Sequence, residues 1–276
     1  MSDLTRSPLL RRRALERELA IRGAASVAEL CHLLGASPAT IRRDLAALED
    51  EGAIKRGYGG ASARSVRPAE EALAVREQKH VDAKRAIARV AVRLIGAGDT
   101  VFLNDGSSIL AVARELAASD IEAFVATPAV NLPSILVANP AISICLLGGF
   151  IRPTSLATGG PFAERMVEQI NADLAILSCD AFNATDGMCF MNAEDAALAR
   201  KMTTKAKRRV ALVHSAKFAW RARISAVPLA DLDVLVTESL PPEVNGELQR
   251  AEVEVVLAGS DVGAAGPDFL SAGSAA

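Results

Sequence analysis

Residues 26–45, SVAELCHLLGASPATIRRDL, contain the signals of two short helices joined by a tight turn. A serine, which is a preferred N-cap, precedes a predicted helix over 27–34, and Gly35 follows it as a stop signal. Ser37 and Pro38 then supply an N-cap and a proline at the first position of a second helix, which runs to about residue 50. The short glycine-bearing turn between these helices is typical of a helix-turn-helix.

The flanking residues add a helix and a hairpin. Before the turn, residues 9–22 carry apolar side chains at helical spacing, and Gly23 ends that pattern, which predicts a first helix. After the turn, residues 53–60 read AIKRGYGG and predict a small hairpin with a basic, glycine-rich tip. Three helices followed by such a hairpin make a winged helix-turn-helix, which we expect to span residues 1–61.

The second helix of the turn would present a polar face to DNA. Ile41, Leu45 and Leu48 form its inward stripe. The side chains left to meet the major groove are those of Ser37, Ala39, Thr40, Arg42 and Arg43. Arginine suits guanine edges and phosphates, and we expect Arg56 and Tyr58 of the hairpin to reach a neighbouring groove or backbone. The alternative is a solvated face of an ordinary three-helix bundle, but the turn, the caps and the hairpin together favour DNA binding.

The net charge of −2 is unevenly distributed. Residues 1–65 hold eleven Lys and Arg against eight Asp and Glu, whereas the rest of the chain is mildly acidic, which suits a polyanion-binding module fused to another body. Four cysteines without a CxxC pair and three scattered histidines predict no disulfide, metal site or cofactor. We expect a cytoplasmic protein without a membrane span, because the amino terminus is polar and prolines, asparagines and glycines interrupt the uncharged segment 123–151.

From residue 73 onward, apolar runs alternate with helical segments. A linker is expected over 62–72, followed by a long helix over 73–94. Seven apolar runs of strand length follow, at 100–103, 123–127, 142–147, 174–178, 210–214, 234–237 and 253–257. This alternation predicts an α/β domain over 73–258, with a Rossmann-like, mostly parallel sheet covered by helices. The Ala-, Gly- and Ser-rich residues 259–276 are expected to form a disordered tail.

The loop after the first predicted strand is a candidate anion-binding site. It reads Asn104-Asp105-Gly106-Ser107-Ser108 and opens a predicted helix. Glycine permits a tight turn, while the two serines offer hydroxyl groups beside the amide donors of a helix N-terminus, which suits a phosphate. The alternative is a serine N-cap at an ordinary strand-to-helix turn.

Other strand ends carry polar or glycine residues that would converge if their strands are neighbours. These residues are Thr127, Gly148, Gly149, Arg152, Asp180 and Lys217. Arg152 and Lys217 could neutralise a phosphate, and Asp180 could accept hydrogen bonds from sugar hydroxyls. Each has an ordinary alternative, because a solvated cation or a carboxylate that caps a turn would look the same in the sequence.

The stretches 27–30 (VAEL), 40–45 (TIRRDL) and 59–61 (GGA) resemble the signature of the DeoR family of bacterial repressors. The resemblance extends over about residues 9–240, because the order of the later segments is similar to the carboxy-terminal sensor domain of that family. It implies a fold related to ribose-5-phosphate isomerase and coenzyme A transferases.

The resemblance also implies ligand contacts at positions that match the family pattern. They are Gly106, Ser107, Ser108, Thr127, Gly148, Gly149, Asp180, Gly187 and Lys217. The chain departs from the pattern at Tyr58, Asn104, Pro128, Ala181, Asp195 and His214, where histidine, aspartate, asparagine, glycine, glutamate and aspartate are usual. The departures near the expected pocket indicate either a ligand with a different hydroxyl pattern or a weaker requirement for a sugar.

These observations favour a ligand-gated repressor of a sugar or polyol operon, acting as a homo-oligomer on double-stranded operator DNA. Its effector would be a small phosphorylated sugar or polyol. The alternatives are a sugar-phosphate isomerase or transferase with an appended DNA-binding domain, and a passive nucleoid or scaffolding protein. We expect no catalytic residues, because proton transfer needs a paired acid and base and the first strand ends in Asn104.

Overall fold

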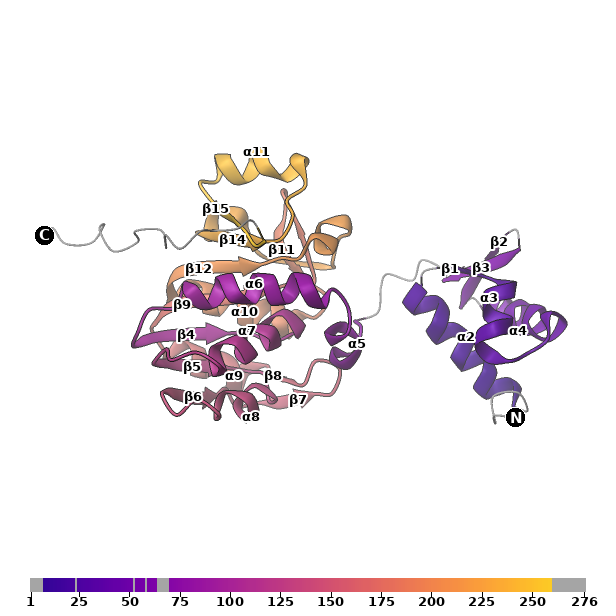
Figure 1. The fold of residues 1–276 in the computed structure, drawn as a ribbon, viewed down its shortest axis with the longest axis horizontal. Coiled ribbons are helices and arrows are strands. Elements are labelled where there is room, and N and C mark those ends of the chain that lie inside the picture. Colours follow the sequence, from indigo (N-terminus) through magenta and orange to yellow (C-terminus); the bar gives the residue numbers. More distant parts are fainter. Residues whose placement is uncertain (1–6, 23, 52, 58, 64–69, 260–276) are drawn as a thin grey trace, which may run out of the picture. The chain divides into compact units, whose positions relative to one another are not determined.

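The computed structural model describes residues 7–22, 24–51, 53–57, 59–63 and 70–259. The chain divides into two compact units, residues 1–69 and residues 70–276, whose elements are shown in Figure 1. Most of the predicted linker, and the predicted tail from residue 260 onward, lie outside the described residues.

The first unit forms three helices and a three-stranded antiparallel sheet from its described residues. In chain order the elements are α2 (Pro8–Arg22), β1 (Ala24–Ser26), α3 (Val27–Leu34), α4 (Pro38–Asp50), β2 (Ile54–Gly57) and β3 (Gly60–Ala63). The strand order is β1-β3-β2. The three predicted helices and the hairpin are confirmed, whereas β1 was not predicted because three small residues show no alternation.

The helix boundaries at the turn are fixed by local hydrogen bonds. Ser26 and Glu29 form a capping box, in which the backbone N of Glu29 donates to Ser26 Oγ (3.2 Å) and the backbone N of Ser26 donates to Glu29 Oε2 (2.7 Å). Gly35 ends α3 with a φ of 62°, a conformation that favours glycine. Ser37 Oγ accepts from the backbone N of Thr40 at 3.2 Å and so begins α4.

A hydrophobic core and a buried ion pair hold α4 against α2. The fully buried side chains of this core include Leu15, Leu19, Leu30, Ile41, Leu45 and Leu48. Arg11 Nε donates to Asp44 Oδ2 at 2.5 Å, and the two residues are only 5% and 2% exposed. Because a buried charge without its partner is destabilising, this pair fixes α4 relative to α2.

The second unit is built on a seven-stranded sheet whose pairings are all parallel, in the order β15-β14-β12-β9-β4-β5-β6 (Figure 1). The strands are β4 (Asp99–Leu103), β5 (Ala123–Thr127), β6 (Ile142–Leu146), β9 (Ala172–Ser178), β12 (Ala206–Leu212), β14 (Val234–Thr237) and β15 (Glu254–Leu257). Each predicted apolar run forms one strand, which confirms the predicted fold class. The run predicted at 210–214 is displaced, because its strand begins at residue 206 and ends at residue 212.

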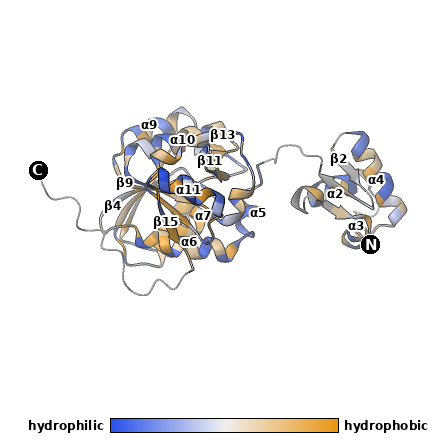
Figure 2. Ribbon diagram, turned by 90° about the horizontal axis from the view of Figure 1, so that it is seen from above, coloured by the Kyte–Doolittle hydropathy of each residue, from blue (hydrophilic) through white to orange (hydrophobic). Residues whose placement is uncertain are grey.

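Helices cover both faces of this sheet. Helices α6 (Val81–Arg93), α7 (Ser107–Ala117) and α8 (Leu132–Leu136) pack on one face, and α9 (Pro161–Glu168), α10 (Ala193–Lys205) and α11 (Pro242–Arg250) pack on the other. Side chains alternate between these faces along β4: Val101 and Leu103 belong to the core under α6, α7 and α8, and Phe102 belongs to the core under α9, α10 and α11. The buried parts of these strands are hydrophobic on both faces, and orange prevails inside the second unit in Figure 2.

The prediction of one helix over 73–94 is wrong. This segment forms α5 (Leu73–Glu77) and then α6, and His80 between them has a left-handed φ of 51°. The ammonium group of Lys84 is buried and donates to two backbone carbonyls of the residues before the break. In a continuous helix those carbonyls would accept from backbone amides four residues later, so the lysine replaces helical hydrogen bonds.

Two smaller sheets flank the main one. Strands β10 (Ala181–Asn183), β11 (Gly187–Phe190) and β13 (Ile224–Val227) form an antiparallel sheet, and β7 (Phe150–Arg152) pairs with β8 (Ala157–Gly159). The sequence did not predict them, because three or four residues are too few to show alternation. The helices that the structure describes are all too short or too polar to cross a membrane.

The buried ion pair of the first unit provides a test of its packing. Asp44→Ala removes a buried carboxylate that Arg11 contacts at 2.5 Å, and we expect the unfolding free energy to fall by about 1.5–3 kcal/mol. Asp50→Ala removes an exposed carboxylate from the same helix and should change it by less than about 0.5 kcal/mol. Calorimetry of the full chain measures both variants. Equal melting of the first unit in both would contradict this role of Asp44.

Candidate functional site

The exposed face of α4 carries the side chains expected to contact DNA. Arg42 and Arg43 are exposed, while Ile41 between them and the turn is fully buried. Of the smaller residues, Ser37 and Ala39 are exposed and Thr40 is half-buried. Arg56 belongs to β2, but its side chain lies outside the described part of the structure, as does the whole of Tyr58. The first unit thus presents two guanidinium groups on the second helix of its turn.

A pocket opens in the second unit where β4 and β9 end. It is a small hollow that is partly open to solvent. The residues that line it come from α5, the ends of the two strands, β11 and α10, and they are Arg76, Asn104, Asp105, Ser178, Cys179, Asp180, Phe190 and Asp195. The carboxyl ends of neighbouring parallel strands meet here, which is the usual ligand position in an open α/β sheet.

The loop after β4 turns sharply into α7. Gly106 has a φ of 108°, which a residue with a side chain rarely adopts, and Ser107 begins the helix. Ser108 Oγ is buried, and no described residue provides it with a hydrogen-bond partner. The first turn of α7 therefore combines the amide donors of a helix N-terminus with an unused hydroxyl group.

Asn104 joins the ends of β4 and β9. Its Nδ2 donates to the carbonyl of Ser178 at 2.8 Å, and its Oδ1 accepts from the backbone N of Ser178 at 2.9 Å. Thr127 Oγ1 donates to the carbonyl of Asn104 at 3.3 Å, and Lys217 Nζ donates to Ser178 Oγ at 2.7 Å. Thr127 and Lys217, both predicted to contact the ligand, thus lie one hydrogen bond behind residues that line the pocket.

Two arginines and several carboxylates share the pocket and its rim. Arg76 Nη1 lies 3.7 Å from Asp180 Oδ1, and its Nε and Nη2 are buried without a hydrogen-bond partner in the described chain. Arg152 donates to Glu70 Oε2 at 2.9 Å and to the carboxylate of Asp195. The predicted cation Arg152 is therefore engaged by two carboxylates, whereas Arg76 is nearly unpaired.

Burial changes the protonation of two pocket carboxyls. It raises the pKa of Asp195 to about 8, with repulsion by Asp105 as the next cause, and it raises the pKa of Asp105 to about 6. Arg76 and Arg152 oppose these shifts by attraction. Near neutral pH the pair can therefore donate as well as accept hydrogen bonds.

The structure brings together some of the predicted ligand residues and separates others. Asn104, Asp105 and Asp180 line the pocket. Gly106, Ser107, Ser108 and Arg152 are not among its lining residues, although the Gly-Ser-Ser turn follows Asp105 directly in the chain. Gly148 and Gly149 are not among its lining residues. A Cβ on Gly149 would lie 2.6 Å from the carbonyl oxygen of Gly159, so this glycine permits the close approach of β7 to β8.

Sequence reasoning missed Arg76, Ser178, Cys179 and Phe190 as lining residues and noted Asp195 only as a departure from the family pattern. Arg76 gave no local signal, because it stood in a segment predicted as one long helix. Its position depends on the break at His80, which is stabilised because the buried Lys84 donates a hydrogen bond to the carbonyl of Arg76.

Comparison with known proteins places both units in one family. A model described as the DeoR-like helix-turn-helix domain matches residues 11–66. A model described as the DeoR C terminal sensor domain matches residues 79–239, which is more than half of the chain.

Whole-length relatives agree with these matches. The HTH-type transcriptional regulator GlpR of Haloferax volcanii is 32% identical over 84% of this chain and 90% of its own. The HTH-type transcriptional repressor GlcR of Bacillus subtilis is 30% identical over 85% of this chain and 90% of its own. Ribose 5-phosphate isomerase A of Methanocaldococcus jannaschii shares 17% identity and a TM-score of 0.38 over 51% of this chain and 55% of that structure. Since both domain models match and the regulators span most of the sequence, the chain belongs to the DeoR family of transcriptional regulators and is a DNA-binding regulator rather than an enzyme.

Proposed function

We propose that this chain represses a sugar or polyol catabolic operon and that a small phosphorylated sugar or polyol releases it from DNA. The family membership supports a role in transcriptional regulation, and the relative GlcR, which is named a repressor, supports repression over activation. In this proposal α4 binds the operator DNA, and the pocket beside α7 binds the effector. Effector binding changes the population of the DNA-competent arrangement.

One observation carries the effector proposal: the Gly-Ser-Ser turn at the start of α7 directly follows Asn104 and Asp105, which line the pocket. The Gly106 turn and the first turn of α7 offer amide donors and the unpartnered hydroxyl of Ser108. Asp105 and Asp180 line the same hollow and can bind hydroxyl groups. A ligand that carries a phosphoryl group and several hydroxyl groups satisfies both halves.

The residue at the end of β4 favours binding over turnover. Isomerisation of a sugar phosphate needs a free general base beside the substrate. At the end of β4, both polar atoms of the Asn104 amide are engaged by the backbone of Ser178. This position therefore holds the pocket wall and supplies no base.

The recognition helix can be tested by alanine substitution. Arg42→Ala and Arg43→Ala should each weaken operator binding roughly 5- to 150-fold, the equivalent of about 1–3 kcal/mol for one lost base contact. Folding should be unaffected, because both side chains are exposed. Arg85→Ala removes an exposed cation from α6 and serves as the charge-matched control. Unchanged gel-shift affinity in both helix variants would show that α4 does not read the operator.

The proposed DNA binding also requires more than one copy of the chain. A single winged unit buries too little DNA surface for operator-grade affinity, and two copies double it on paired half-sites. We expect a homodimer or homotetramer. Sedimentation at micromolar concentration should then show a mass at least twice the 28.9 kDa of one chain. A monomer that binds the operator tightly would contradict this expectation.

The effector site can be tested with the double variant Ser107→Val/Ser108→Val, which removes both hydroxyl groups at the start of α7. A thermal-shift screen of the wild-type chain against glycerol 3-phosphate, ribose 5-phosphate, glycerol and ribose first identifies an active compound, because a ligand of the folded state raises its melting temperature. The double variant should lose release from DNA by that compound while its operator affinity stays within about twofold, since the helix-turn-helix is a separate unit.

Ser134→Val on α8 is a matched control, because this serine is exposed and far along the chain from the loop. If the double variant responds at the wild-type concentration, or if glycerol or ribose is the active compound, the phosphate assignment is wrong.

A further inference from the structure

The guanidinium group of Arg76 lacks acceptors for most of its donors. Its Nε and Nη2 are buried and without a hydrogen-bond partner among the described residues, and its Nη1 lies 3.7 Å from Asp180 Oδ1, beyond hydrogen-bond distance. A guanidinium group does not lose its proton in proteins, so its buried donors need an external acceptor. The acceptor that the protein itself offers is limited, because Asp180 Oδ2 already accepts from the backbone N of Met191 at 2.8 Å.

The unpaired guanidinium group lies beside the start of α7. A Cβ on Gly106 would lie 3.7 Å from Arg76 Nη1, which places the cation against the glycine turn. In the first turn of the same helix, Ser108 Oγ is also buried without a partner in the described residues. Unsatisfied donors from α5 and α7 therefore adjoin one turn. Their common complement is an anionic group with several oxygens, of which a phosphoryl group is the best match.

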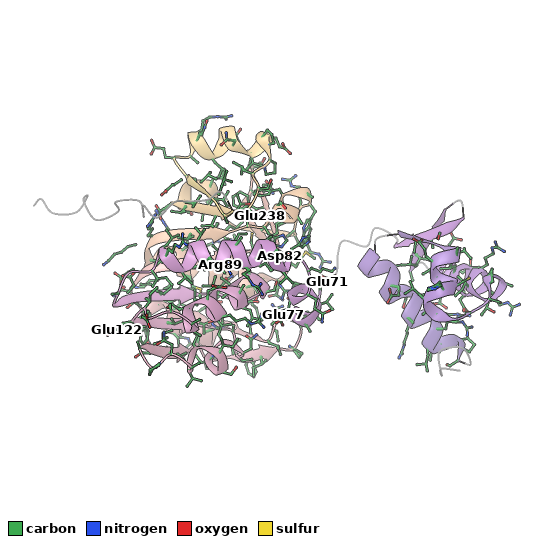
Figure 3. All side chains as sticks on the ribbon, in the orientation of Figure 1. Glu71, Glu77, Asp82, Arg89, Glu122 and Glu238 are labelled. Atoms are coloured by element: carbon green, nitrogen blue, oxygen red, sulfur yellow. The ribbon has the colours of Figure 1, made fainter. Side chains whose placement is uncertain are left out.

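Arg76 belongs to the first described residues after the DNA-binding unit. We call residues 70–80 the proximal segment. It is held to the rest of the second unit by the Glu70–Arg152 pair (2.9 Å), by the backbone N of Leu73 donating to the carbonyl of Thr154 (2.8 Å) and by the pair of Glu77 with Arg114 of α7. Figure 3 shows Glu71 and Glu77 beside α5, at the same end of the unit as Glu238 and away from Glu122.

We propose that Arg76 binds the anionic group of the effector and thereby fixes the proximal segment against α7. This inference rests on the proposed effector pocket and names the residue that links it to the DNA-binding unit. Among the contacts described above, the Glu77–Arg114 pair is the ion pair that joins α5 to α7. An anion bound between Arg76 and the start of α7 would add a second charged contact between these two helices. Effector binding is thus converted into order at the residues through which the chain leaves the sensor unit.

The test compares Arg76→Gln, Arg76→Lys and the control Arg85→Gln in the full chain. Probes are glycerol 3-phosphate and ribose 5-phosphate, with glycerol, ribose and inorganic phosphate beside them. Arg76→Gln should bind the active sugar phosphate roughly 10- to 100-fold more weakly, since a charge-assisted contact is lost. Arg76→Lys should be intermediate, because it keeps the charge and loses the planar fork. Arg85→Gln should match the wild-type chain.

Two further readouts separate anchoring from a general structural role. Without ligand, Arg76→Gln should melt no lower than the wild-type chain, because it removes a buried cation that has little to pair with. Hydrogen exchange at residues 73–80 should slow when sugar phosphate binds the wild-type chain and should not respond in Arg76→Gln.

The outcomes distinguish the two proposals. If no phosphorylated compound binds the wild-type chain, the proposed function and this inference both fail. If the wild-type chain responds and Arg76→Gln binds with equal affinity, Arg76 is not the anchor and the inference alone fails. If the affinity falls but exchange at residues 73–80 is unaffected by ligand in the wild-type chain, the coupling through the proximal segment is contradicted.

Discussion

The rest of the sensor pocket depends on the two hydrogen bonds between the Asn104 amide and the backbone of Ser178. They join the ends of β4 and β9, which are followed by the pocket-lining residues Asp105 and Asp180. An amide can make this contact because it donates and accepts at once, whereas an ionised carboxylate only accepts. Asparagine in place of the aspartate usual in the family therefore serves the wall of this pocket, and Thr127 and Lys217 support the same wall from behind.

With the wall fixed, the charges around the pocket remain unbalanced. Burial raises the pKa of Asp195 to about 8, so this carboxyl keeps its proton near neutral pH, and it raises the pKa of Asp105 to about 6, while Arg76 keeps its charge with few partners. A ligand with an anionic group would pair with the arginine, and its hydroxyl groups would form hydrogen bonds with the carboxyls. The effector that we propose, with a phosphoryl group and several hydroxyl groups, would meet both conditions, whereas a simple anion or an uncharged sugar would meet only one.

Local signals explain why so much of the fold could be predicted from the sequence. Capping residues such as Ser26 and Ser37 act within a few positions, and strands buried on both faces read as apolar runs. The failures have two causes. The break before α6 depends on the buried Lys84, and β7, β8, β10, β11 and β13 are too short to show a pattern. At the pocket, the strand-end loop could be predicted, but the unpaired state of Arg76 could not, because it follows from that break.

The packing inside each unit also limits how ligand binding can change the affinity for DNA. Helix α4 is fixed to α2 by a filled core and by the buried Arg11–Asp44 pair, so a change inside the helix-turn-helix would have to break a costly contact. The pocket is lined by residues from 76 to 195, all within the second unit. A ligand there acts on DNA binding either through the association of sensor units or through the residues where the second unit begins. The proximal segment belongs to the second route, and its contacts with the pocket, through Glu70–Arg152–Asp195 and through Arg76, consist of charges that an anionic ligand can rearrange at little cost to either core.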